Sequence, residues 1–406
     1  MTKRTAIKVG SLVLAFVLLA GLPSGALAVA IQNGTGTITP NIGISNGTSI
    51  GFAGKEWWVI GDDSTGVSPM SGHMTLLVKG GEPYKNTEFD TDANRSPGSA
   101  NDSYEGSLLQ ARMSEIYLND TTKLPAGITG IADAREQALI SSRDLKATDG
   151  IVGADANNQY LWPLSYDEWT AIHNATVLSY GGWFWLRSSH AGNTEIDAGN
   201  NIGTGVDDFN VATHDYAVRP ALNVDLTNVL FTSAATGGKD GAAGDILSAA
   251  TAPTGTAKLT VLDTSLNFTG ATITNVSGRT MTLSYVGAKA GATLSAIVKS
   301  SGGEVKYYGK LATGISASGS IAVTVPDAIA VGDTLEIFAE EINGDNLTDF
   351  AGTPISFSLA AYVRTIHPVP KTGDDFPHVE LAMVTIVLGS AGVLLLAQKK
   401  RKQKSD

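Results

Sequence analysis

Residues 181–189 read GGWFWLRSS, and this stretch decides how the first half of the chain folds. In an extended strand, successive side chains point to opposite faces, so Trp183, Trp185 and Arg187 share one face. Phe184 and Leu186 occupy the other face. Large apolar side chains on both faces are typical of a strand that is covered on both sides. The stretch therefore predicts a central strand within a folded core.

Two interpretations apply to the aromatic and arginine side chains of this stretch and of the later VRPAL block at 218–222. Aromatic faces stack on the apolar faces of sugars, and arginine forks clamp carboxylates, so the side chains could form a binding platform. Alternatively, the tryptophans pack in the core and the arginines bind backbone carbonyls or buried acids. The alternation favours the core interpretation. The side chains concerned are Trp183, Trp185, Arg187 and Arg219.

The neighbouring patterns predict an α+β domain over residues 31–231. The stretch IGFAGKEWWVIG reads as two strands joined by a short turn at residues 53–55. The stretch SLLQARMSEIYLND predicts a helix with one apolar face, formed by Leu108, Leu109, Met113, Ile116 and Tyr117. Ser165 is expected to cap a helix that begins near Tyr166, with residue 168 completing a capping box.

A change of composition predicts a second unit. Residues 232–257 are rich in Gly, Ala, Ser and Thr and are expected to be a linker. After it, TMTLSYV at 280–286, SIAVTV at 320–325 and TLEIFAEE at 334–341 alternate apolar and polar residues, as strands do. Residues 258–360 are therefore expected to form an immunoglobulin-like β-sandwich that serves as a spacer.

The two ends of the chain do not read as parts of a domain. Lys3, Arg4 and Lys8 precede an apolar run at 12–22, and small residues follow at 24–30. This order predicts a secretory signal peptide over residues 1–30 that is cleaved after Ala28 or Ala30. At the other end, the uncharged run 381–397 is followed at once by the basic residues 399–402. Residues 374–406 are therefore expected to form a transmembrane helix with a cytoplasmic tail.

A pentapeptide stands before this apolar run. Together the parts resemble the LPxTG-type sorting signal of Gram-positive surface proteins, with Val where the family usually has Leu. Proline fixes an extended peptide that a processing enzyme can reach. The resemblance implies that a sortase cuts after Thr372 and joins this residue to the peptidoglycan, so that residues 361–373 lie next to the wall. The motif residues are Val369, Pro370, Lys371, Thr372 and Gly373.

Residues 50–231 resemble a second family, an extracellular domain of unknown function from Firmicutes. The resemblance rests on EWWVI at 56–60, on the segment 164–169, on WFWLRS at 183–188 and on VRPAL at 218–222. The tryptophan-rich strands are also similar to those of the C-type-lectin-like fold of formylglycine-generating enzymes and bacterial adhesion proteins. Neither resemblance implies an activity.

Composition excludes some classes of function. The chain has no cysteine, so it has no disulfide and no cysteine-based catalysis. Its net charge of −11 disfavours nucleic acid as a partner, because binding there rests on cationic contacts to phosphates. The histidines show no zinc-binding spacing. Calcium is the one cofactor that the sequence leaves open, through oxygen ligands of the acidic loop 197–215 and its residues Asp197, Asp207 and Asp208.

The sequence thus predicts an extracellular protein that passes through the plasma membrane as a precursor and becomes covalently anchored to the cell wall. Its expected role is to display a domain that binds an unidentified extracellular glycan or protein. Two alternatives remain open, a wall- or glycan-modifying enzyme and a structural stalk or pilus subunit. For the enzyme, the acidic side chains of the loop 197–215 are candidates for glycoside hydrolysis, but a solvated acidic loop is the favoured interpretation.

Overall fold

Strands form 43% of the computed structural model and helices 13%, so the chain is a β-rich fold. The predicted α+β, C-type-lectin-like class is therefore wrong. The structure describes residues 49–363 with the exception of 63–66, 68–69, 81–83, 85, 92–102, 125, 127, 147–154, 173, 190–194, 200–204, 211, 251–252, 254 and 361.

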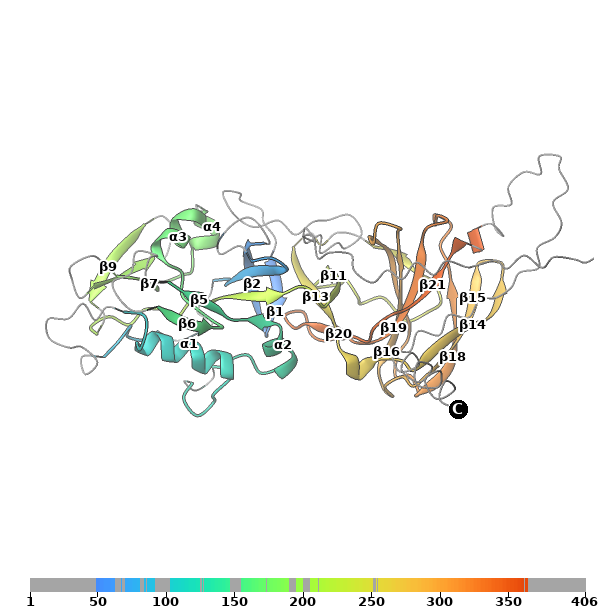
Figure 1. Cartoon of the computed structure of the whole chain (residues 1–406), viewed down its shortest axis with the longest axis horizontal. Coiled ribbons are helices and arrows are strands. Elements are labelled where there is room, and N and C mark those ends of the chain that lie inside the picture. The colour runs from blue at the N-terminus through green and yellow to red at the C-terminus, as the bar shows by residue number, and fades with distance from the viewer. Residues whose placement is uncertain are drawn as a thin grey trace, which may run out of the picture.

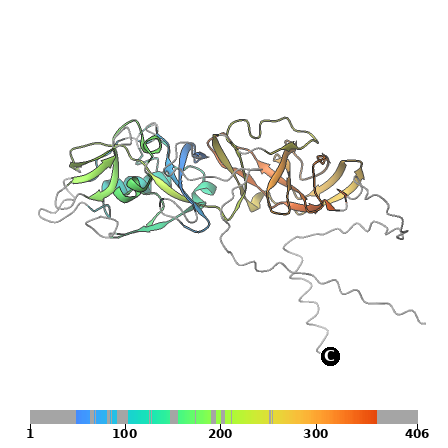
Figure 2. The same ribbon diagram turned by 90° about the horizontal axis from the view of Figure 1, so that it is seen from above.

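Two lobes lie side by side along the long axis of the molecule (Figures 1 and 2). The helices in the described part of the first lobe are α1 (Leu108–Leu118), α2 (Ala134–Ala138), α3 (Tyr166–Ile172) and α4 (Ala175–Leu178). Its strands are β1 (Ser49–Phe52), β2 (Lys55–Gly61), β3 (His73–Val78), β4 (Ile140–Ser141), β5 (Arg143–Leu145), β6 (Ala156–Gln159), β7 (Phe184–Ser189), β8 (Glu195–Gly199), β9 (Val206–Asn210) and β10 (Ala221–Asp225).

The remaining strands form the junction and the second lobe. They are β11 (Val229–Ala234), β12 (Ser248–Ala249), β13 (Thr256–Leu262), β14 (Gly270–Ser277), β15 (Thr280–Val286), β16 (Thr293–Lys299), β17 (Val305–Ala312), β18 (Ser318–Thr324), β19 (Thr334–Glu341), β20 (Asp349–Ala351) and β21 (Ile355–Ser358).

One 13-stranded sheet runs through both lobes, in the order β12-β17-β16-β19-β20-β13-β1-β2-β3-β10-β4, with β11 and β21 as side branches. Strand β13 joins the lobes. One edge of β13 pairs antiparallel with β11, and the other pairs in parallel with β1 and then with β20. Strands β16, β17, β19, β20 and β21 therefore share a sheet with the first lobe, whereas β14, β15 and β18 form a sheet of their own. The shared sheet corrects the expectation of a separate immunoglobulin-like sandwich.

The strand pair at the start of the described chain is confirmed. Strands β1 and β2 pair antiparallel through a two-residue turn at Ala53 and Gly54, whose φ angles are 51° and 76°. Positive φ at both turn positions matches the twist of the flanking strands. The Trp57 side chain is fully buried and its Nε1–H donates to the Phe52 carbonyl at 2.8 Å. This bond links the two strands of the hairpin, and the buried indole packs the hairpin into the core.

The expected strands of the second lobe are also confirmed. The stretches TMTLSYV and TLEIFAEE coincide with β15 and β19, and SIAVTV overlaps β18. In β15 the apolar residues Met281, Leu283 and Tyr285 are buried, and the intervening ones are partly exposed. Strand β15 lies between β14 and β18 in a separate three-stranded sheet. The period of two therefore reports which face of this sheet meets the core.

The predictions for the two ends of the chain and for the linker stay open. Residues 1–30 and 361–406 lie outside the described residues, apart from 362–363, so the signal peptide and the sorting segment stay predictions. Among the described residues, no helix has the length and apolar character needed to cross a membrane. The segment 232–257 contains the end of β11, all of β12 and the buried Lys239 side chain. Its role as a domain boundary stays a prediction.

Close packing at the junction gives a first test. A Cβ added at Gly51 would lie 2.4 Å from the carbonyl oxygen of Asp345 and 2.9 Å from the Cα of Asn346, both backbone atoms. We expect Gly51→Ala to lower the free energy of unfolding by about 1–3 kcal/mol, because the backbone of the second lobe must move. Urea unfolding followed by tryptophan fluorescence measures the change. Gly241→Ala is the control, because no atom lies within 4 Å of a Cβ added there. Equal stability of the two variants would contradict the close packing of Gly51 against the second lobe.

Candidate functional site

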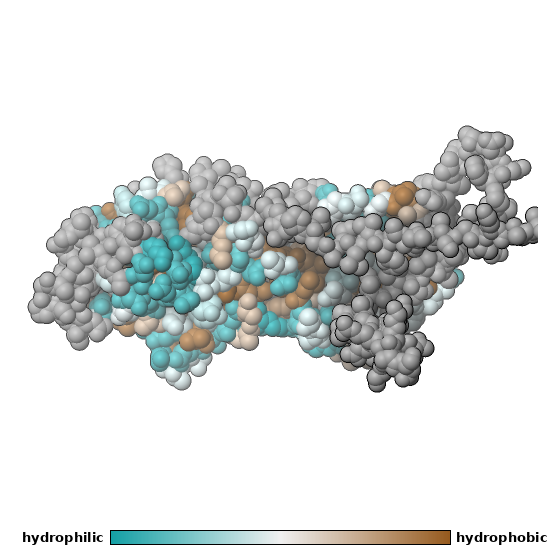
Figure 3. Space-filling model, viewed as in Figure 1, coloured by the Kyte–Doolittle hydropathy of each residue, from teal (hydrophilic) through white to brown (hydrophobic). Residues whose placement is uncertain are grey.

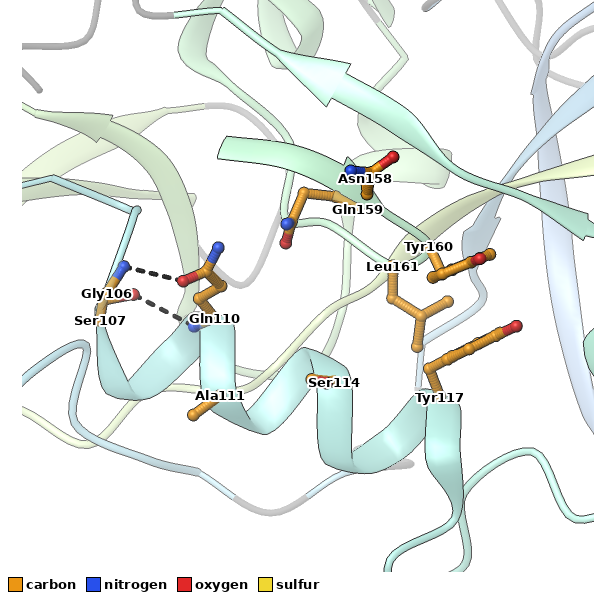
Figure 4. Close-up of a pocket in the computed structure, with 10 residues that line it drawn as sticks. All are labelled: Gly106, Ser107, Gln110, Ala111, Ser114, Tyr117, Asn158, Gln159, Tyr160 and Leu161. Atoms are coloured by element: carbon orange, nitrogen blue, oxygen red, sulfur yellow. Dashed lines mark hydrogen bonds between the residues drawn. The ribbon is translucent and has the colours of Figure 1, made fainter. Parts of the chain in front are cut away.

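A polar groove of about 340 Å³ opens on the first lobe between α1 and β6 (Figure 4). One wall comes from the start and the exposed face of the helix, and the other from the end of the strand. The residues that line it are Gly106, Ser107, Gln110, Ala111, Ser114, Tyr117, Asn158, Gln159, Tyr160 and Leu161.

The helical wall is built by the cap of α1. The Ser107 hydroxyl accepts a hydrogen bond from the Gln110 N–H at 3.1 Å, which satisfies one of the free donors at the start of the helix. The Gln110 side-chain oxygen accepts from the Gly106 N–H at 2.8 Å, and its amide nitrogen donates to Glu105 at 2.8 Å. Figure 4 shows the first two of these bonds. The cap therefore holds the Gln110 amide at the rim of the groove.

The opposite wall follows from an unusual backbone position. Asn158 has a φ angle of 56°, a left-handed conformation that asparagine tolerates better than most residues. Its N–H donates to the Asp144 carboxylate on the paired strand at 3.0 Å. The neighbouring Gln159 amide donates to the Asn157 carbonyl at 2.7 Å. This local structure presents two amide side chains at the groove.

A pair of tyrosines closes one end of the groove. The rings of Tyr117 and Tyr160 stack with centroids 4.2 Å apart and planes 4° apart (Figure 4). The Tyr160 side chain is 38% exposed. Partial burial and the neighbouring phenol raise the pKa of Tyr117, so its hydroxyl stays protonated at neutral pH. The pair thus presents an aromatic surface beside hydroxyl groups.

The chemistry of this lining suits binding rather than acid–base catalysis. The groove offers amides, hydroxyls and aromatic rings, and tyrosine is the one titratable residue type among its lining residues. Amide and hydroxyl groups both donate and accept hydrogen bonds, as the hydroxyls of a sugar require. Aromatic faces cover apolar surface of the same ligand. A neutral polyhydroxylated ligand therefore matches the groove.

The predicted residues Trp185 and Arg219 are core residues, with 0% and 1% exposure. Trp185 Nε1–H donates to the Thr87 carbonyl at 2.8 Å. Arg219 donates to the carbonyls of Val177, at the end of α4, and of Leu178, the latter at 2.8 Å. Burial lowers the pKa of Arg219 to about 9, a shift that Tyr180 partly opposes. The arginine thus satisfies carbonyls that a helix end leaves free.

Arg187 is fully buried and ties its strand to α3. It donates to the Pro163 carbonyl at 2.8 Å and forms an ion pair with Glu168. The capping box is confirmed, because the Glu168 N–H donates to the Ser165 hydroxyl at 3.1 Å while the Glu168 carboxylate accepts from the Ser165 N–H at 3.0 Å. Burial alone would raise the pKa of Glu168, but Arg187 and Arg143 lower it to about 2. The structure therefore fits the core interpretation of Arg187.

The other predicted positions are scattered. Trp183 is half-buried and packs edge-on against Phe209 at 5.0 Å between ring centroids. Asp197 lies in β8, directly opposite residue 208 of β9, and Asp207 is exposed. Within the part of the chain that the structure describes, no three metal-binding side chains cluster. The sorting residues 369–373 lie outside the described residues.

The groove residues were not singled out from the sequence. The sequence pattern places Tyr117 on the apolar face of its helix and predicts no element for residues 157–160, NNQY. Three consecutive amide side chains before an exposed aromatic residue are the signal that could have indicated this wall. That this run lies opposite α1 across one groove follows only from the tertiary structure.

Comparisons with known proteins add little. No family model and no curated protein sequence matches the chain. Among solved structures, a β-D-glucuronidase of Dictyoglomus thermophilum is matched over 40% of this chain and 29% of that one, with 11% identity and a TM-score of 0.13. A likeness this weak carries no argument about fold or function.

The ion pair of Glu168 with Arg187 predicts that the protein loses stability in acid. The pKa of the Glu168 carboxyl is lowered from 4.5 to about 2. Its contribution to the free energy of unfolding is therefore present above about pH 4.5 and is lost as the pH falls toward 2. That shift corresponds to about 3 kcal/mol. We expect Glu168→Gln to lower the free energy of unfolding by this amount at pH 7. Between pH 7 and pH 3, the variant should lose less stability than the wild type does, because it no longer carries this carboxylate.

Urea unfolding at pH 7 and pH 3 measures both values. Asp327→Asn is the control, because this carboxylate pairs with Arg279 at 2.7 Å but is 80% exposed, and exposed pairs contribute little. If Glu168→Gln and Asp327→Asn had the same stability at pH 7, the assigned role of the buried pair would be wrong.

Proposed function

We propose that this protein is displayed on a Gram-positive cell surface and binds an extracellular glycan in the groove between α1 and β6. The observation that carries the proposal is the combination of the stacked Tyr117–Tyr160 pair with the amides of Gln110, Asn158 and Gln159 in one open groove. Binding, rather than catalysis, follows from the neutral lining.

The exposure of the groove supports this role. Asn158 and Tyr160 are exposed, whereas Trp185 and Arg187 of the WFWLRS block are buried. A ligand can therefore reach the first group without any rearrangement of the core. Where Figure 3 colours the first lobe, teal and white residues predominate over brown ones on the face in view.

The order of parts at the two ends supports wall display. The signal-peptide pattern at 1–30 would export the chain, and the apolar run 381–397 with its basic tail would retain it at the membrane. A sortase would then cut between Thr372 and Gly373 and join Thr372 to peptidoglycan. The described chain ends at residue 363 in the second lobe, at the far end from α1 (Figure 1). Attachment there would direct the groove away from the wall.

Substitution of Tyr160 tests the groove. We expect Tyr160→Ala to weaken glycan binding at least about tenfold, because the exposed half of the aromatic pair is lost. Tyr160→Phe keeps the ring and should retain most of the affinity. A glycan array identifies the ligand for the purified chain, and calorimetric titration with the best-binding oligosaccharide gives the affinities.

The control for this experiment is Tyr166→Ala, a tyrosine with 46% exposure that stacks on Trp169 outside the groove. It should bind as the wild type does. No glycan binding by the wild type, or equal losses in the Tyr160 and Tyr166 alanine variants, would contradict the proposed site.

Substitution of Thr372 tests the attachment. In a sortase-bearing Gram-positive host, we expect muramidase digestion to release the wild type from the cell envelope and to leave Thr372→Ala with the membrane fraction. Lys371→Ala is the matched control, since this position is variable in the motif that the segment resembles. If wild type and Thr372→Ala fractionate alike, the pentapeptide is not a sorting signal.

A further inference from the structure

Two lysines and two carboxylates are buried together at the junction of the lobes. Lys239 and Lys258 are 5% and 3% exposed, and Glu340 and Asp349 are fully buried. Burial of four ionised groups is costly, and proteins rarely bury lysine and acid side chains without a specific reason. None of these residues lies near the groove described above. The cluster therefore calls for its own explanation.

The contacts within the cluster divide the two lysines into different roles. Lys239 Nζ contacts the Asp349 Oδ2 atom at 2.8 Å, the Glu340 carboxylate, and the Thr260 hydroxyl at 2.6 Å. Lys258 Nζ instead lies 2.8 Å from Asp349 Oδ1 and donates to the carbonyl of Asn343 at 2.7 Å. Only Lys239 thus lies between two carboxylates.

The surroundings of Lys239 are apolar and aromatic. Its Nζ lies 4.6 Å from the Phe231 ring centroid and 5.6 Å from that of Tyr308. Phe231 packs in one buried cluster with Phe338 and Ala351. In such a site water is excluded, so the charged pair is not solvated and an amide, once formed, is protected from hydrolysis.

The Asp349 carboxyl group is held in the orientation that acyl transfer requires. Its Oδ1 atom accepts from the Asn343 N–H at 2.7 Å and faces the Lys258 ammonium, two donors that would stabilise negative charge on this oxygen. Its Oδ2 atom faces Lys239. Glu340 is fixed on its other side, where its Oε2 atom accepts from Ser295 at 2.7 Å and from Tyr308 at 2.9 Å.

We propose that Lys239 and Asp349 become joined by an amide bond between Nζ and Cγ, with Glu340 as the proton carrier. Glu340 takes one proton from the ammonium and delivers it to Oδ2. The free amine then attacks Cγ, and negative charge collects on Oδ1 between Lys258 and the Asn343 N–H. A second proton passes from nitrogen through Glu340 to Oδ2, the C–O bond breaks, and one water leaves.

The atoms and charges of this step balance. Of the three protons on the ammonium, one stays on the amide nitrogen and two leave in the water, whose oxygen is the former Oδ2. The positive charge of Lys239 and the negative charge of Asp349 disappear together, and Lys258 and Glu340 remain as one charge of each sign. No oxidant, reductant or other reactant is needed. The bond would close the chain between positions 239 and 349 and clamp both edges of β13.

Peptide mapping of the full chain by mass spectrometry tests the proposal. The peptides that carry residues 239 and 349 should be recovered from the wild type as one species, lighter than their sum by one water. Fragmentation should place the link between Lys239 and Asp349. Recovery of the two peptides separately at their full masses would overturn the proposal, and so would a link to Glu340 or to Lys258. This measurement requires no variant to fold.

Two variants test the roles of Lys239 as the nucleophile and of Glu340 as the proton carrier. Lys239→Arg keeps a positive charge but removes the nucleophile, so the linked species should be absent. Glu340→Gln keeps the shape but removes the proton carrier, so most of the chain should remain unlinked while its circular dichroism spectrum stays that of the wild type. Lys299→Arg is the control, because Lys299 pairs with Glu336 at 2.9 Å in a partly exposed site, and it should keep the link. Full linkage in Glu340→Gln would overturn the role of Glu340.

Discussion

Strand β13 is the element on which the arrangement of the molecule depends. It pairs with β11 on one edge and with both β1 and β20 on the other, so its backbone donors and acceptors are used within the sheet. A buried strand with unpaired edges would leave polar groups without partners, at a cost comparable to several lost hydrogen bonds. The pairing of β13 thus holds the two lobes in one sheet.

Side chains reinforce the same junction. Glu136 of α2 is 1% exposed and its carboxylate accepts from the N–H groups of Ala53 at 3.1 Å and Thr348 at 2.8 Å, one in each lobe. Burial raises the pKa of Glu136, and these two hydrogen bonds partly oppose the rise. Arg135 lies 3.8 Å from the Phe350 ring centroid and forms an ion pair with Glu341 at 3.0 Å. Polar contacts across the lobes therefore accompany the backbone pairing.

Charged side chains in the core and uncharged polar side chains at the surface have different roles in this molecule. In the first lobe, the buried Arg187 and Arg219 bind backbone carbonyls and Glu168, which fixes helix ends against the core. The groove between α1 and β6 instead presents uncharged polar groups to water. Charged groups hold the fold together where water is excluded, because each has a fixed partner. The uncharged groups remain available to a ligand.

Local elements could be predicted well where a local rule applies. The hairpin turn at Ala53 and Gly54, the helix over Leu108–Leu118, the capping box of Ser165 and Glu168, and the alternation of β15 all follow from contacts within a few residues. The α+β assignment was wrong because the short strands β5, β6, β8 and β9 are polar or acidic. Strands β5, β6 and β9 have no regular apolar alternation, and β8 alternates only over residues 195–198, which is too short a run to distinguish it from a loop.

The sequence by itself determined the local elements, the absence of cysteine chemistry and the acidic character of the chain. Tertiary structure alone decided the parallel pairing of Ser49–Phe52 with Thr256–Leu262, the groove that joins α1 to β6, and the meeting of Lys239 with Glu340 and Asp349. The reason is sequence separation, since Lys239 and Asp349 are 110 positions apart. Local propensity acts over a few residues, whereas contacts at this distance form only when the whole sheet has found its strand order.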